Sequence, residues 1–149
     1  MNPTTEALAI NFRITNYLLD EITDEQWTAK AAKGKTVQGC FTHIHNVRLM
    51  WLKVWDAMGD LEKLDDKSAT KEQTKAALEA SAKAMETAID EFISKGTRPK
   101  SFKPSAEAFV GYITAHEANH RAQVDFILRL AGKPISDAVH YGMWEWGVR

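Results

Sequence analysis

Over four long segments of this chain, apolar residues recur every three or four positions, which is the spacing of one face of an α-helix. Runs of β-branched residues in strict alternation, which would indicate strands, do not occur. The sequence therefore predicts an all-α fold. The predicted long helices run roughly from Thr5 to Ile22, from Val37 to Met58, from Lys71 to Ser94 and from Ser105 to Ala131.

Capping signals and breakers bound these helices. A Thr followed three residues later by Gln has the spacing of a capping box, and Gly with a following Pro is typical of a helix end. A capping box after the first long helix predicts a short extra helical turn. The signals are Thr23 with Gln26, Thr70 with Gln73, Gly59, and Gly132 with Pro134.

Four amphipathic helices predict a four-helix bundle in one domain over residues 1–149. The long connection around Asp60 to Ala69 leaves the topology open. An aromatic-rich tail, Tyr141–Gly147, follows the last long helix, and we expect it to pack its tryptophans over one end of the bundle. Glu145 lies between two of these tryptophans and could instead reach a cleft or a partner subunit.

Composition excludes several functional classes. The chain has 149 residues, of which 44% are hydrophobic, and a formal net charge of −1, which suits one ordinary globular domain. No basic face appears, so nucleic acid is not an expected partner, and no stretch approaches the roughly 18 apolar residues that span a membrane. Cys40 is the only cysteine, which favours a cytoplasmic location, and its expected role is that of a small buried residue.

Two histidines interrupt what looks like the buried face of the fourth long helix. His116 and His120 fall on the same stripe as the apolar residues Phe109, Ile113 and Ile127. Imidazoles at i and i+4 are neighbours on a helix surface, so both nitrogens can converge on one ion. A single buried histidine usually has a hydrogen bond to a carbonyl group, but two on one stripe indicate a metal site.

The second long helix supplies the third candidate ligand. His43 and His45 lie about 100° to either side of the stripe centred on Ile44, so periodicity alone does not choose between them. Three histidines with one open coordination position form a known type of catalytic zinc site. Imidazole also suits nickel, iron and copper. We therefore expect one divalent cation, with zinc or nickel favoured.

The same segment matches the H-E-x-x-H pattern of zinc proteases, in which the glutamate is the general base. Glu117 is therefore a weak candidate for a catalytic residue. It lies about 100° away from the histidine stripe, however, which favours either a solvated helix residue or a hydrogen-bond partner for a ligand imidazole. His140, just before the aromatic tail, could line the pocket or lie in a surface loop.

Three passages resemble the DinB family, within the DinB/YfiT-like superfamily of metal-binding four-helix bundles: residues 41–52, residues 115–123, and residues 131–147. In this family one histidine of the second helix, followed eight residues later by Trp-Leu, joins two histidines of the last long helix as metal ligands. The resemblance therefore implies His43, which precedes Trp51 at that distance, with His116 and His120, and makes His45 the runner-up. Asn119 and Ala122 depart from the family pattern beside these ligands.

The resemblance also implies an activity. Some relatives are transferases or isomerases that use low-molecular-weight thiols, so we expect a metal-dependent enzyme that transfers such a thiol to a small-molecule substrate. The alternatives are a metal-dependent hydrolase, a non-catalytic metal-binding stress-response protein, and a helical protein whose core histidines bind no metal. Relatives often pair, so a homodimer is also expected.

Overall fold

The structure is a computed structural model that describes residues 2–149. Over these residues it is all-helical, as predicted, and its two β-bridge residues lie outside any strand. The helices are α1 (Pro3–Glu21), α2 (Asp24–Trp27), α3 (Val37–Val54), α4 (Lys71–Ser94), α5 (Ala106–Leu130) and α6 (Asp137–Gly142).

Side-chain caps begin the helices. The residue before each helix accepts a hydrogen bond from a backbone N–H of the first turn, which satisfies a donor that the helix itself leaves free. Both predicted capping boxes are present, and the first one starts the short helix α2. The capping residues are Asn2, Thr23, Thr36, Thr70, Ser105 and Ser136.

Helix α3 ends earlier than the sequence predicted. Asp56 has a positive φ of 57°, and the N–H of Ala57 donates to the carbonyl of Leu52 at 2.8 Å. This pattern is a Schellman motif, which closes a helix with one left-handed residue. Gly59, the predicted stop, also has a positive φ of 54°, but it lies in the connection that follows. An aspartate in the left-handed region therefore ends the helix before the glycine does.

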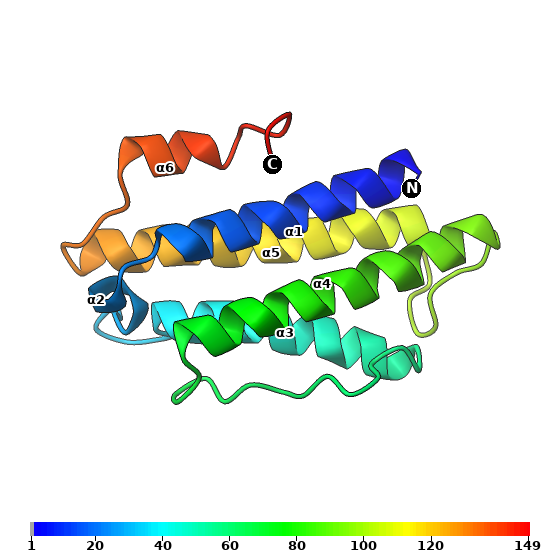
Figure 1. The fold of residues 1–149 in the computed structure, drawn as a ribbon, viewed down its shortest axis with the longest axis horizontal. Helices are drawn as coiled ribbons and strands as arrows, with labels where there is room; N and C mark the ends of the chain where they lie inside the picture. Colours follow the sequence, from blue (N-terminus) through cyan, green and yellow to red (C-terminus); the bar gives the residue numbers. More distant parts are fainter. Residues whose placement is uncertain (1) are drawn as a thin grey trace.

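The four long helices lie side by side (Figure 1). Helices α1 and α5 run in one direction, whereas α3 and α4 run in the other. Helix α1 packs against α4 and α5, and α3 packs against the same two helices. The connection between α3 and α4 runs back along α3, which makes these two consecutive helices parallel. This order places α3 directly beside α5, the two helices that carry the candidate histidines.

Hydrogen bonds from α3 hold that long connection in place. Asn46 donates to the carbonyl of Leu64 and accepts from its N–H, both at 2.9 Å. His45 bonds through Nε2 to the carbonyl of Glu62 at 2.9 Å. A carbonyl can only accept, so this ring nitrogen carries the proton. The connection is thereby fixed to α3 at the level of the histidines.

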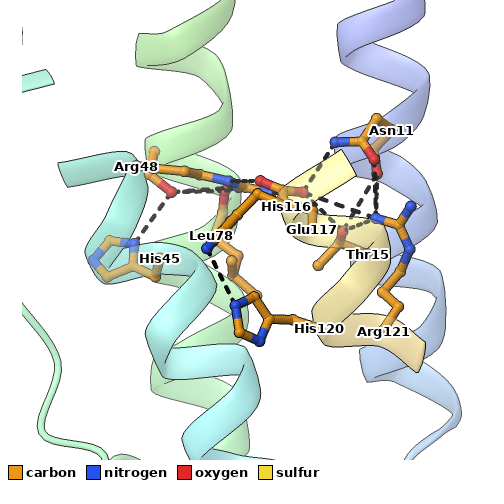
Figure 2. A network of polar contacts seen from close by, with 10 residues as sticks. Asn11, Thr15, His45, Arg48, Leu78, His116, Glu117, His120 and Arg121 are labelled. Atoms are coloured by element: carbon orange, nitrogen blue, oxygen red, sulfur yellow. Dashed lines mark hydrogen bonds and ion pairs between the residues drawn. The ribbon is translucent and has the colours of Figure 1, made fainter. Parts of the chain in front are cut away.

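The core is divided along the length of the helices. One apolar cluster contains Leu18, Phe41 and Val124, and a second contains Phe12, Leu52 and Phe109. Between them lies a layer of buried polar side chains to which each long helix contributes, and which we call the polar layer (Figure 2). Its members are Asn11, Thr15, His45, Arg48, Ser81, Glu117 and Arg121.

The C-terminal tail packs differently from the prediction. Residues 137–142 form α6, which lies along α1 and contacts the first apolar cluster through Val139 and Met143 (Figure 1). Gly142 is so close to α1 that a Cβ there would lie 2.2 Å from the Tyr17 hydroxyl. Trp144 and Trp146, however, are 73% and 39% exposed. The prediction that the tryptophans cover one end of the helices is therefore wrong, because α6 turns its aliphatic face inward and both tryptophans follow its end.

The last residues are tied to the same surface. The Arg149 guanidinium lies 3.6 Å from the centre of the Tyr17 ring and donates to the carbonyl of Gly142 at 2.9 Å. It also forms an ion pair with Glu145 at 3.0 Å. Glu145 thus interacts within the tail rather than with a cleft. None of the helices in residues 2–149 is both long and apolar enough to cross a bilayer.

Candidate metal centre

Helices α3 and α5 bring three imidazoles together. His43 comes from α3, and His116 and His120 lie one turn apart on α5. The ring centres are 4.5 Å apart for His43 and His120, 5.4 Å for His43 and His116, and 4.6 Å for His116 and His120. One nitrogen from each ring lies within 4.8 Å of the other two. We call this group the three-histidine cluster.

The spacing of the nitrogens fits a bound metal ion. The Nε2 atoms of His116 and His120 are 3.2 Å apart. Two nitrogens that bind one tetrahedral zinc at about 2.0–2.1 Å are separated by about 3.3 Å. No other His, Cys, Asp or Glu in residues 2–149 belongs to the group. Three neutral nitrogen ligands leave a fourth position open, which is the arrangement of catalytic rather than structural zinc sites.

A hydrogen bond orients His120. Its Nδ1 lies 2.9 Å from Oε1 of Gln123, one turn further along α5. Because an amide oxygen only accepts, Nδ1 carries the proton and the lone pair of Nε2 points toward His116. Gln123 therefore fixes the ring in the tautomer that a metal ion requires.

Replacing Gln123 should weaken metal binding without removing a ligand. We expect Gln123→Leu to raise the dissociation constant for Zn²⁺ by about 10–100-fold, the usual effect of losing a hydrogen-bond partner of a ligand histidine. Competition with a chromophoric chelator measures this constant. Asn119→Leu changes an exposed amide on the same helix and should leave the constant unchanged. Equal affinities for the two variants would contradict the role given to Gln123.

Burial keeps the three imidazoles neutral. Burial, the nearby Lys35 ammonium and the other two imidazoles lower the pKa of His43 to about 4. Burial is also the main cause that lowers the pKa of His116 and that of His120. Neutral imidazole is the form that coordinates metal ions. At neutral pH the cluster thus presents three lone pairs rather than positive charges.

Cys40 lies beside the cluster but does not join it. The thiol is buried, and burial raises its pKa to about 11. Its Sγ atom is 3.9 Å from Oε1 of Gln123, the oxygen that also orients His120. Thiolate, not thiol, is the metal ligand and nucleophile. Cys40 is thus placed as a small core residue.

The other two candidate histidines lie elsewhere. His45 is fully buried in the polar layer, where its Nδ1 lies 3.1 Å from Oγ of Ser81 on α4. Its two ring nitrogens are occupied by Ser81 and by the carbonyl of Glu62, so it faces away from the cluster (Figure 2). His140 is half-buried in α6, beside Tyr141, and is not part of the cluster.

Glu117 is not a solvated residue, which corrects one interpretation of the sequence. Its side chain is 0% exposed, and Arg48 donates to its two oxygens from Nε at 2.7 Å and from Nη2 at 3.0 Å. Asn11 and Thr15 of α1 donate to Oε2 at 3.1 and 3.0 Å (Figure 2). These four contacts occupy the carboxylate within the polar layer, and it is not one of the groups in the three-histidine cluster.

The buried face of α5 keeps Phe109, Ile113 and Ile127 from the predicted stripe but is rotated toward Glu117. Glu117 and Val124 are fully buried at its centre, whereas His116 is half-buried and Leu130 is 60% exposed. His43 and His116 therefore lie at the edge of the core, whereas His120 is buried, with 6% of its surface exposed. Arg48, fully buried on α3, is the residue that makes this rotation possible, because it neutralises Glu117. The sequence did contain a signal for this pair. Arg48 and Glu117 are charges of opposite sign, and each lies on an otherwise apolar stripe of its helix.

One of three comparisons with known proteins gives a match, and that match is to a family. The model of the DinB family matches residues 6–145. Comparison with curated proteins and with solved structures gives no significant match. The matched range includes all three histidines of the cluster and both helices that carry them. Because the family match covers nearly the whole chain, this protein belongs to the DinB family.

Proposed function

We propose that this protein is a metal-dependent enzyme built on a four-helix bundle. In this proposal His43, His116 and His120 hold one divalent cation, zinc or nickel, and the enzyme transfers a low-molecular-weight thiol to an electrophilic small molecule. The metal site rests on the 3.2 Å separation of the His116 and His120 Nε2 atoms, with a His43 nitrogen within 4.8 Å, and the thiol transfer rests on the family resemblance. Membership of a metal-associated family supports it.

A divalent cation with an open position is a Lewis acid that lowers the pKa of a thiol or water placed there. The chain supplies what such chemistry needs around it. Gln123 holds His120 in one tautomer, and the half-buried edges of His43 and His116 leave the cluster accessible. In the transfer, the thiol loses its proton, its sulfur forms a bond to an electrophilic carbon, and a leaving group departs with the electrons of the broken bond.

A groove gives a small molecule access to His43. It has a volume of about 1030 Å³ and is lined by α3 and by the connection that runs back along it. Ligand sites in proteins commonly have volumes of about 300–1,000 Å³. The groove is therefore large enough for a thiol and an electrophile together, with His43 on its wall.

The experiment compares the parent protein, His116→Ala and His140→Ala, all purified without an affinity tag. Elemental analysis should find about one divalent metal ion per chain in the parent and in His140→Ala, and far less in His116→Ala. With a thiol and an electrophile, the metal-loaded parent should form the conjugate, and His116→Ala should not. Hydrolysed electrophile without conjugate would indicate the hydrolase instead. Equal metal content in all three proteins would overturn the metal site itself.

A further inference from the structure

Lys35 lines the same groove as His43 and lies on a loop that backbone contacts hold in place. It precedes Thr36, the N-cap of α3, and the loop before it is closed by a β-bridge between Lys30 and Thr36. The N–H of Val37 also donates to the carbonyl of Ala29 at 2.9 Å. These contacts fix the backbone on both sides of the loop, so the position of Lys35 relative to α3 is set by the fold.

The side chain of Lys35 starts above the face of α3 that carries His43. A Cβ atom built on Gly39 would lie 3.8 Å from the Cβ of Lys35. Gly39 precedes His43 by one helical turn and shares its face of the helix. Lys35, Gly39 and His43 also line the same groove. A lysine stem is long enough to cover one helical turn, so the ammonium can reach a ligand bound beside His43.

The charge of Lys35 is not neutralised by an ion pair with any of the described residues. None of the ion pairs in residues 2–149 includes Lys35. A lone cation beside a cation site is unfavourable by Coulomb's law, but an anion placed between the two charges makes both interactions attractive.

We propose that Lys35 binds an anionic group of the ligand that takes the open coordination position. The site then prefers a thiol that carries a second, negatively charged group over a neutral thiol of the same size. This inference rests on the proposed function, because it assumes a metal ion in the three-histidine cluster. It adds the substrate class: a small anionic thiol.

The test uses the Co²⁺-loaded protein, because Co²⁺ reports thiol binding through its absorption spectrum. The two probes, 2-mercaptoethanesulfonate and 2-mercaptoethanol, share a two-carbon thiol. Only the first carries a negative charge, and its sulfonate group coordinates metals weakly. Lys35→Ala should weaken binding of the sulfonate by about fivefold, the upper range for one exposed ion pair, and leave 2-mercaptoethanol unchanged. Lys35→Arg should retain most of the preference.

Lys33→Ala is the matched control, because Lys33 is an exposed lysine of the same loop. It should behave as the parent with both probes. If Lys35→Ala weakens both thiols equally, or neither, the role of Lys35 is refuted while the metal site stands. If the parent gives no Co²⁺ spectrum that His116→Ala abolishes, the proposed function fails first and the inference fails with it.

Discussion

Glu117→Gln should lower the free energy of unfolding by about 3–5 kcal/mol, the cost of leaving a buried charge without its partner. The substitution keeps the shape of the side chain but removes the negative charge that faces the buried Arg48 guanidinium at 2.7 Å. Arg48 cannot lose its proton and has no route to water, since it is fully buried. Because whole domains are stable by only about 5–15 kcal/mol, this is a large fraction of the total. Urea unfolding of the metal-free protein, followed by circular dichroism, measures it.

Glu91→Gln provides the matched control. Glu91, on α4, forms an ion pair with Lys95, which directly follows that helix, but both side chains are more than half exposed. Removing that pair should cost less than about 1 kcal/mol. The double variant Arg48→Met with Glu117→Leu should be more stable than Glu117→Gln, because the fully buried Arg48 charge is then removed together with its partner, while Arg121 keeps its bonds to Asn11 and Thr15. A cost for Glu117→Gln no greater than that for Glu91→Gln would show that the Arg48–Glu117 pair does not stabilise the core.

The pair also matters for the metal centre. Glu117 follows His116 directly, and Arg48 lies five residues after His43, so the ion pair joins α3 to α5 beside the cluster. Arg48 further donates to the carbonyl of Leu78 on α4 at 2.8 Å, and Asn11 and Thr15 extend the contacts to α1. A shift of one helix along another would break these bonds. We infer that the polar layer sets the register in which the three imidazoles meet.

The helices could be predicted from the sequence because their signals are local. Apolar spacing and capping residues act within a few positions of one another, and α4 has the predicted bounds, from Lys71 to Ser94. The early end of α3 could not be predicted in this way. It depends on Asp56 adopting a left-handed conformation that glycine prefers, although Gly59 stands only three residues later. Gly59 is the more typical residue for a helix end, but α3 ends at the left-handed Asp56 instead.

The site was predictable only in part, for a related reason. Because His116 and His120 lie four residues apart on one helix, their spacing alone predicts that they are neighbours. The structure brings both together with His43. Periodicity could not choose between His43 and His45, because that depends on which helix packs on each side of α3. Glu117 was predicted to be either solvated or a hydrogen-bond partner of a ligand imidazole for the same reason. Its partner Arg48 comes from another helix, so the spacing within α5 can show a charge on a buried stripe but not the residue that neutralises it.

Metal binding should stabilise the parent protein by an amount that the histidine variants lose. The cluster joins α3 to α5, and its spacing depends on the folded state, so the metal ion should bind the folded chain far better than the unfolded one. At a free Zn²⁺ concentration about 100 times the dissociation constant, the free energy of unfolding should rise by about 2.7 kcal/mol. For a chain of this size that corresponds to an increase in Tm of about 5–10 °C, measured by calorimetry with and without Zn²⁺.

Single histidine variants distinguish a metal ion that is bound between α3 and α5 from one that is bound by α5 alone. If α3 supplies a ligand, His43→Ala should lose most of the increase even though His116 and His120 remain paired on α5. A site made by α5 alone would instead lose it in His116→Ala but keep it in His43→Ala. His45→Gln removes the neighbouring histidine, whose nitrogens bond to Ser81 and Glu62. It should lower the Tm of the metal-free protein and leave the Zn²⁺-dependent increase intact, because its place in the polar layer is structural.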